Sequence, residues 1–457
     1  MNEHIKLFLD QLGEAQDRYD EADSYFRGVP EEVWSSPKLR AALGITGNET
    51  AFKENYSAVP VKAMAARMNL SGFNVPGNDD ATDFLSQLWT DSKMNLEFHG
   101  FLRDCCKYGE GFIEIDFADI DGQLTVDICP VDVKRAQLVY SPDDMREKLF
   151  FGKLNRIPSN YYGTPGAFVN QVTLKYADRI EVWVQENPES ENYLPQYYVE
   201  DELGNDDWED NPLGEVPAYH FRNETPFGVP EHIDTYGAQD QLVKIILNEM
   251  SVLQYVGLPA RYTIMNDDAT AGAAFGVPGQ GDAGLKKDET KAPSPNPDDH
   301  VLIKGKATGT YAAADVTQLI NAKKDIKESM AVLSDTPIRY FTDPGGAHPS
   351  GDSLRAADAR FKAKILNRQE MYAETLAEVF KAALVLAGFV DTEEPVINWK
   401  PQIMEQDKSL FEIVKMKIDL GIPKYVAFLE AGYEEDLDWM KALKAEYEAA
   451  LTVNPTE

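Results

Sequence analysis

Apolar residues recur at helical spacing over much of the chain. Near the start, Ile5, Phe8, Leu9 and Leu12 fall on one helical face. Similar stripes predict helices over 59–70, 236–256, 315–334 and 353–387, and shorter helices over 408–420, 424–430 and 434–451. The helix at 353–387 is the longest, and at 1.5 Å per residue it is about 50 Å long.

The pattern changes near Gly111, where apolar and polar residues begin to alternate. The alternation continues on both sides of Asp121-Gly122, a pair that favours a type I′ hairpin turn because both central positions need a positive φ. Further strands are predicted at 148–154, 171–177, 179–185 and 195–201. Residues 110–222 are therefore expected to form a largely antiparallel sheet, and the chain belongs to the α+β class.

Two more strands, 260–265 and 300–305, are predicted between the helices at 236–256 and 315–334. The stretch that separates them, 266–299, is rich in Gly, Pro, Ala and Asp, has no apolar periodicity, and is expected to be mobile. It contains a GxGxxG string at Gly279, Gly281 and Gly284. Because no strand precedes this string and no helix follows it, the string does not predict a dinucleotide site.

The chain has 457 residues, which suggests about three structural units. Its 44 Lys and Arg against 77 Asp and Glu give a net charge of −33. Such a balance disfavours tight wrapping of nucleic acid and binding to anionic membranes, and it fits solubility or salt adaptation. We expect a soluble protein without a signal peptide, because the first residues lack an apolar core segment.

Catalytic and metal-binding signals are weak throughout. The three cysteines form no CxxC pair and are expected to be reduced thiols. The sequence has no GxxxxGK[ST], HExxH or GxSxG string, and no His pairs with a Ser or Cys at a useful spacing. We therefore expect no catalytic residue, no metal site and no cofactor.

Four dispersed segments nevertheless resemble one family, the tailed-bacteriophage portal proteins of long-tailed phages with Gram-positive hosts. The most specific resemblance precedes the helix at 236–256, at Leu213, Gly214, Val216, Pro217, Phe221, Arg222, Asn223, Gly228 and Asn248. The other three are 55–73, which resembles an early helix and the strand after it, 106–115 and 336–379. Together they span about 50–450.

The resemblance implies a portal-type α+β fold with named parts. Residues 1–235 and the long helix at 351–399 would form the wing. The two stem helices would be 236–257 and 315–335, with the clip at 258–314 between them. The tunnel loop would be 336–350, and 400–457 would form a helical crown.

The resemblance also implies where DNA passes. The tunnel loop would line the channel with Tyr340, Phe341, Thr342, Asp343, Gly345, Gly346 and His348. The second stem helix would add Lys323, Lys324 and Lys327. Two alternatives stay open: the lysines form a solvated outer face, and the loop is a connector whose Ile338, Tyr340 and Phe341 pack into the core.

A portal protein is a non-enzymatic ring, commonly of twelve copies, at one vertex of the capsid. The implied partners are double-stranded DNA, the terminase large subunit, which hydrolyses ATP, the major capsid or scaffolding protein, and a head-tail adaptor protein. We expect no membrane partner, assembly in the host cytoplasm, and a final place in the virion. The alternatives are an acidic intracellular hydrolase with unidentified catalytic carboxylates, or another phage head protein such as a capsid or adaptor protein.

Overall fold

The chain forms two compact units. The first contains Met1–Asp23, Val59–Ile233 and Asp335–Glu457, and the second contains Ser24–Ala58 and Asp234–Ser334. The computed structural model describes residues 2–28, 54–120, 123–158, 168–195, 208–257, 261–265, 301–304, 307–310, 316–342, 351–389, 392–400, 407–430 and 438–453.

The first unit is built on helices at both ends of the sequence. Its helices are α1 (Glu3–Arg27, whose last turn belongs to the second unit), α3 (Ala58–Ala65), α4 (Asp79–Asp91), α5 (Met94–Tyr108), α9 (Gly351–Leu386), α10 (Asp407–Asp419), α11 (Lys424–Leu429) and α12 (Asp438–Val453). The long helix and the three short C-terminal helices confirm the sequence prediction. The helix predicted over 59–70 is only partly confirmed, because the observed helix ends at Ala65 and a strand begins at Leu70.

The first sheet has three strands, with β2 (Glu110–Ile120) at its centre. Strands β2 and β3 (Gln123–Val131) pair antiparallel, with Ile120 opposite Gln123, as the alternation around Asp121-Gly122 predicts. The turn residues themselves lie outside the described part of the chain. Strand β10 (Ala218–Arg222) pairs antiparallel with the other edge of β2.

A second, six-stranded sheet follows in the same unit. It has the order β4-β5-β6-β7-β8, with β9 also paired to β7. The strands are β4 (Ala136–Tyr140), β5 (Lys148–Pro158), β6 (Phe168–Lys175), β7 (Arg179–Gln185), β8 (Tyr193–Pro195) and β9 (Glu209–Asp210). All pairs are antiparallel, as expected, and most of the strand predicted at 195–201 lies outside the described residues.

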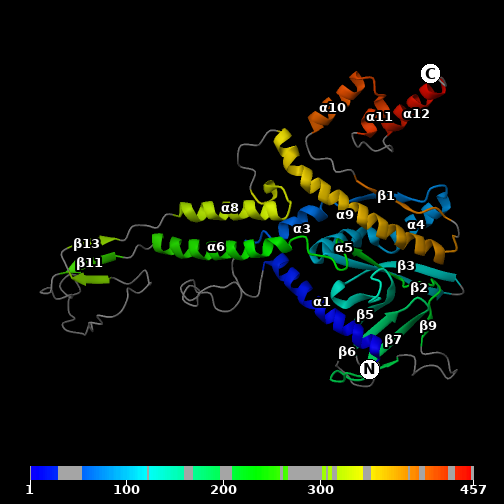
Figure 1. Ribbon diagram of the computed structural model, residues 1–457, viewed down its shortest axis with the longest axis horizontal. Coiled ribbons are helices and arrows are strands. Elements are labelled where there is room, and N and C mark those ends of the chain that lie inside the picture. The colour runs from blue at the N-terminus through cyan, green and yellow to red at the C-terminus, as the bar shows by residue number, and fades with distance from the viewer. Residues whose placement is uncertain are drawn as a thin grey trace. The chain divides into compact units, whose positions relative to one another are not determined.

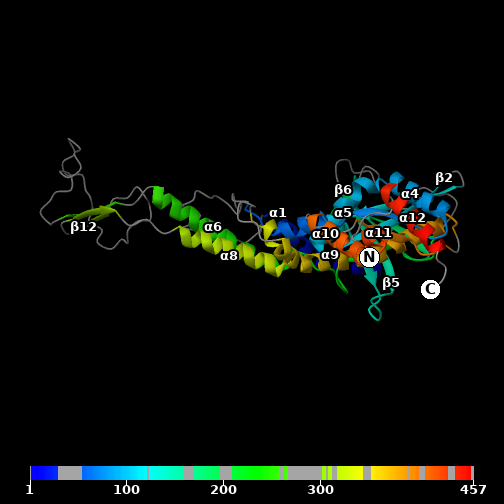
Figure 2. The same ribbon diagram turned by 90° about the horizontal axis from the view of Figure 1, so that it is seen from above.

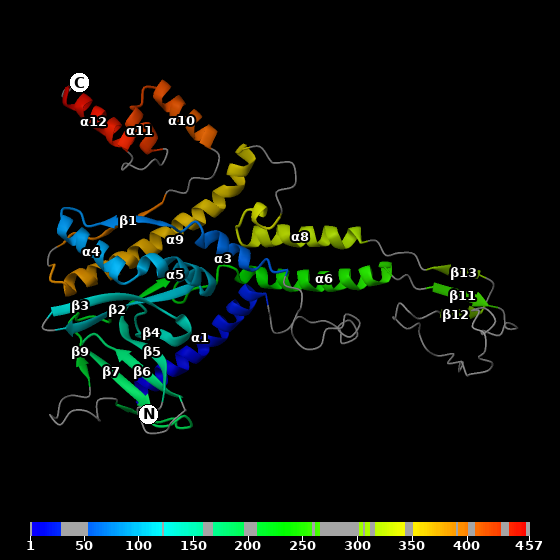
Figure 3. The same ribbon diagram turned by 180° about the vertical axis from the view of Figure 1, so that it is seen from behind.

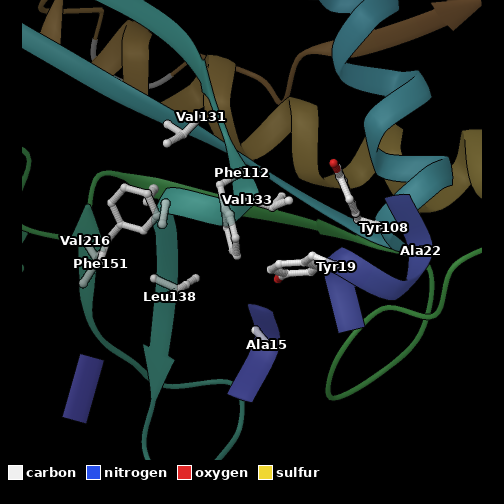
Figure 4. Close-up of a cluster of buried hydrophobic side chains, with 12 residues drawn as sticks. Ala15, Tyr19, Ala22, Tyr108, Phe112, Val131, Val133, Leu138, Phe151 and Val216 are labelled. Carbon is white, nitrogen blue, oxygen red and sulfur yellow. The ribbon is translucent and has the colours of Figure 1, made fainter. Parts of the chain in front are cut away.

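The sequence predicted one sheet where the structure has two. A 3₁₀ turn, η1 (Val133–Arg135), redirects the chain between β3 and β4, and the Asp132 side chain caps it by accepting a hydrogen bond from the Lys134 amide at 3.0 Å. Side chains of α1, notably Tyr19, meet Phe112 of the first sheet and Phe151 of the second in one buried cluster (Figure 4). Burial of that shared apolar surface favours two packed sheets over one wide sheet.

Helix α1 packs closely on the second sheet. Its buried residues Ile5, Phe8 and Leu12 contact apolar side chains of β4, β5 and β6. The helix approaches β5 at Gly152, where an added Cβ would lie 2.3 Å from a ring carbon of Phe8. A glycine is therefore required at this position by space and not by its backbone angles.

A small two-stranded sheet joins distant parts of the first unit. Strand β1 (Leu70–Asn74) pairs antiparallel with β14 (Val396–Trp399). Helix α9 runs beside β1 and α4 (Figure 1, Figure 3), and its Phe380 ring lies 4.5 Å from that of Phe73. The sequence analysis did not predict β14, because four residues with a partner so far away carry little local signal.

The second unit is dominated by two helices that lie side by side, α6 (Tyr236–Gly257) and α8 (Thr317–Leu333) (Figure 1, Figure 2). Both confirm predicted helices. The unit also contains a three-stranded sheet in which β11 (Arg261–Met265) pairs parallel with β12 (Val301–Lys304) and antiparallel with β13 (Ala307–Thr310). Strands β11 and β12 were predicted, whereas β13, with the sequence ATGT, was missed.

Within the described residues, no helix combines the length and the apolar character needed to cross a bilayer. The same residues contain no group of three or more His, Cys, Asp or Glu side chains arranged to hold a metal ion. The segment 266–299, with its GxGxxG string, lies outside the described residues.

Candidate functional site

The loop that leads into α6 is fixed around a buried carboxylate. Glu231 is only 3% exposed at its side chain, and its two oxygens pair with two cations of α9: Lys364 Nζ at 2.7 Å from Oε2 and Arg368 Nε at 2.7 Å from Oε1. Asn223 Nδ2 donates a third hydrogen bond to Oε1 at 2.9 Å. Burial raises the pKa of Glu231, but Lys364 and Arg368 outweigh this effect and hold the pKa below its usual value.

The backbone of the same loop lies close to the backbone of Gly109. Asn223 accepts a hydrogen bond from the Val229 amide at 2.8 Å and also receives Arg368 Nη1 at its backbone oxygen, at 3.0 Å. A Cβ at Gly228 would lie 2.0 Å from the carbonyl oxygen of Gly109, so only glycine fits there. Asn223 and Gly228 are two of the positions that carry the family resemblance, and both have a structural role in this loop.

The connector after α8 is anchored to α9 over 338–341. A short 3₁₀ turn, η5 (Ile338–Tyr340), precedes Phe341, whose side chain is only 2% exposed. The Tyr340 ring lies 5.9 Å from Phe361 of α9. Arg339 Nη1 is 2.6 Å from Asp358 Oδ1, and although burial lowers the pKa of Arg339, this carboxylate raises it above the usual value.

Of the seven predicted loop residues, the structure describes three. Thr342 is exposed, and its hydroxyl donates to the Ile338 carbonyl oxygen at 3.2 Å. Tyr340 is half-buried and accepts a hydrogen bond from Arg67 at 3.2 Å. Phe341 packs in the core, so its side chain is not available to line a channel. The other four, Asp343, Gly345, Gly346 and His348, lie outside the described residues.

The three predicted lysines of α8 have different surroundings. Lys323 Nζ pairs with Glu249 Oε2 of α6 at 2.7 Å. Lys327 Nζ donates to the Tyr56 hydroxyl at 2.6 Å and lies 3.3 Å from Glu54 Oε1. Lys324 is 69% exposed at its side chain, and among the residues that the structure describes its ion-pair partner is Glu328, at 3.8 Å. Lys323 and Lys327 therefore pair with residues of the second unit.

Lys327 is held by more than its ion pair. Its Nζ lies 4.1 Å from the centroid of the Tyr56 ring. Burial lowers the pKa of Lys327, but the hydrogen bonds to Tyr56 and Glu54 raise it above its usual value. The lysine is thus charged at neutral pH and serves to hold the segment 54–56 against α8.

The beginning of α6 is held by an aromatic stack and a set of hydrogen bonds that the sequence analysis did not predict. The Tyr25 and Tyr236 rings are stacked at 3.9 Å with an angle of 4° between their planes, and the Tyr25 hydroxyl donates to Asp240 at 3.1 Å. Asn55 Nδ2 donates at 2.9 Å to the carbonyl oxygens of Tyr25 and of Phe26, which close the end of α1. The one signal in the sequence was that the segment 55–73, which resembles the family, begins at Asn55.

The family "Phage portal protein, SPP1 Gp6-like" matches residues 48–448 of the sequence. The chain belongs to this family. The match covers nearly the same range as the resemblance of the four dispersed segments, and it confirms the predicted portal family and the α+β portal fold class. The Gram-positive host stays a prediction. The helix pair α6 and α8, the connector 336–342 and the long α9 are therefore parts of a portal-family protein.

Two solved structures are also similar to this portal-family chain. One is the virion of a native gene transfer agent particle, with 12% identity, a TM-score of 0.44, and coverage of 90% of this chain and 94% of that chain. The other is the neck of an empty gene transfer agent particle computed with C6 symmetry, with 12% identity, a TM-score of 0.46 and the same coverage. No curated protein matches the sequence significantly.

Proposed function

We propose that the chain forms a closed ring at one capsid vertex and that the ring conducts double-stranded DNA during packaging and ejection. The family match over residues 48–448 carries this proposal. A closed ring of identical chains needs a head-to-tail interface that closes by rotation, and twelve copies is the number that the family suggests. The net charge of −33 per chain supports a channel to which DNA does not adhere.

Each part of the chain receives a role in this ring. The wing is 1–235 together with 351–399, the stem helices are 236–257 and 315–335, the clip is 258–314, and the crown is 400–457. The order helix, small sheet, helix, connector, long helix supports this assignment, since α6, β11, β12, β13, α8 and α9 follow one another in that order.

The tunnel loop is 336–350, and within it the structure supports a division of roles. Tyr340 and Phe341 anchor the loop because they pack against α9 and the core. The DNA contacts fall to Thr342 and to Asp343, Gly345, Gly346 and His348, the residues after the anchor. On α8, Lys324 is the lysine that is free enough to meet DNA phosphates, whereas Lys323 and Lys327 stabilise the stem.

The ring docks the terminase large subunit, which supplies ATP hydrolysis, and later the head-tail adaptor protein. It is incorporated into the shell through the major capsid or scaffolding protein. The chain itself has no enzymatic role in this scheme. The buried His220 has a structural role, because its Nε2 lies 2.8 Å from Glu110 and its Nδ1 lies 2.9 Å from the Tyr140 hydroxyl.

Electron microscopy and mass photometry of the purified protein test the ring. We expect a large oligomer with a central hole. A stable monomer over a wide range of protein and salt concentrations overturns the proposal, provided that the protein is folded by circular dichroism.

Deletion of residues 342–347 tests the tunnel loop. Because the anchor at 338–341 is retained, we expect rings to assemble while packaging or retention of DNA is impaired. The matched control is Phe341→Ala, which removes the anchor and is expected to lower thermal stability. If the deletion prevents folding of the monomer, the segment is a core connector and not a channel loop.

A further inference from the structure

The long helix α9 carries an uneven distribution of charge. Its first half, Gly351–Arg368, has five basic and two acidic residues, a net charge of +3 in a chain of −33. Its second half, Gln369–Leu386, has three glutamates and one lysine. The helix dipole does not produce this order, because it acts only within the first and last turns, where it favours acidic and basic residues respectively.

Some of the basic residues are used within the chain. Lys364 and Arg368 are neutralised by the buried Glu231, at 2.7 Å each. Arg339, on the connector beside α9, is neutralised by Asp358. The two pairs with Glu231 explain part of the positive charge of α9. Together with the Arg339–Asp358 pair they fix the loops that precede α6 and follow α8.

Arg360 and Lys362 are different. The Arg360 side chain is 80% exposed, and its ion-pair partner Asp335 lies at 4.0 Å, the outer limit for such a pair. Lys362 is exposed and pairs with no carboxylate in the part of the chain that the structure describes. An exposed pair held so loosely contributes little to stability, so folding does not explain these two cations.

Their position links them to the tunnel loop. They flank Phe361, which is buried and lies 5.9 Å from Tyr340, the residue that anchors the start of the loop. Arg67 also reaches this place, since its Nη2 donates to the Tyr340 hydroxyl at 3.2 Å. Arg67 and Arg360 thus each contact a residue of the connector between α8 and α9, Tyr340 and Asp335 respectively, and Lys362 lies on the same turn of α9 as Arg360. Two of the lysines on α8 are instead paired with carboxylates of their own unit.

We propose that Arg360 and Lys362 contact phosphate groups of duplex DNA at the base of the tunnel loop, an inference that rests on the proposed function. The contact is electrostatic and independent of base sequence, because a guanidinium and an ammonium recognise the phosphate and not the base edges. It gives the channel a narrow cationic zone in an otherwise acidic chain. The attraction between these two cations and the phosphates holds packaged DNA at the base of the loop. The acidic residues of the rest of the chain let the DNA slide.

The test uses the assembled protein and a short fluorescent duplex DNA of mixed sequence. Anisotropy measured over a range of salt concentrations gives the slope of log affinity against log salt. For the variant Arg360→Gln with Lys362→Gln we expect weaker binding and a slope that is shallower by about 0.9 for each phosphate that the protein no longer neutralises. The conservative change Arg360→Lys should keep most of the slope.

The matched control removes the same charge from other exposed sites of unit 1, as Lys381→Gln with Lys400→Gln, one of them on the acidic half of α9. This control should bind DNA as the unchanged protein does. If the unchanged protein forms no rings, the proposed channel function fails. If its rings bind no duplex DNA at any salt concentration, the inference fails while the channel stands. If they bind it, and the Arg360 and Lys362 variant binds with the same affinity and slope, the inference fails while the channel stands.

A third outcome would give Arg360 and Lys362 a role in ring assembly. If the Arg360 and Lys362 variant is folded but does not assemble, whereas the control assembles, the two side chains pair with carboxylates of a neighbouring copy and the phosphate role is overturned. Mass photometry before the anisotropy measurement separates this outcome from a loss of DNA binding.

Discussion

Glu231, on the loop before α6, and Arg368, in the middle of α9, are joined by a hydrogen bond of 2.7 Å although 137 residues separate them in the sequence. A second cation, Lys364, holds the other oxygen of the same carboxylate. The chain therefore fixes the loop that precedes α6 to α9, the helix that follows the connector after α8.

Replacing Glu231 by Gln should destabilise the first unit strongly. The change removes the buried carboxylate charge that faces both Lys364 and Arg368, and breaking such a pair typically costs about 3–5 kcal/mol. Thermal unfolding followed by circular dichroism measures the effect. Glu224→Gln, a neighbouring change at an exposed position, is the control and should leave the midpoint nearly unchanged.

Gly152→Ala should separate α1 from the second sheet. The new Cβ would lie 2.3 Å from the Phe8 ring, and the resulting displacement is expected to cost about 1–3 kcal/mol of unfolding free energy. Gly13→Ala is the control on α1, because nothing lies within 4 Å of its added Cβ. That change should stabilise the helix by about 0.5–1 kcal/mol, and equal effects of the two substitutions would contradict the packing described above.

His232 should make stability fall in mild acid. Its ring is buried, Nε2 lies 3.0 Å from the Ala22 carbonyl oxygen, and burial lowers its pKa from 6.5 to about 4. The unfolded chain therefore binds a proton first as pH falls, so stability decreases between pH 6.5 and 4 by up to about 3 kcal/mol and the effect ends below pH 4.

Urea unfolding at several pH values measures this effect, with His232→Gln as the comparison. Gln retains a donor for the Ala22 carbonyl oxygen but does not titrate, so its stability should depend less on pH between 6.5 and 4. Identical pH profiles for the two proteins would show that His232 does not titrate in this way.

The three lysines of α8 should differ in their effects. Lys327→Gln removes a cation–π contact and two charged hydrogen bonds, and we expect it to lower stability by about 1–2 kcal/mol. Lys324→Gln should change stability by less than about 0.5 kcal/mol because its ion pair is exposed. Thermal midpoints of the single variants check both values.

The same variants separate stem stability from DNA contact. If Lys324→Gln alone alters packaging in a salt-dependent manner, the lysine contacts DNA as proposed. If only Lys323→Gln and Lys327→Gln alter packaging, and in proportion to their loss of stability, the lysines of α8 act on the stem and not on DNA.

Local signals in the sequence determined much of the secondary structure. The stripes that predict α6, α8 and α9 and the alternation that predicts β2 and β3 depend on neighbours a few residues apart, so they are readable without the fold. The dispersed segments also pointed to the portal family, and two of their residues, Asn223 and Gly228, shape the loop before α6.

Tertiary structure alone decided which side chains are available for function. Phe341 and Lys327 have ordinary local sequences, and only the fold shows that one packs in the core and the other is held by Glu54 and Tyr56. The pairing of β1 with β14 and the bond between Glu231 and Arg368 join residues far apart in the chain. Such contacts depend on packing across the whole unit, and a local pattern does not specify them.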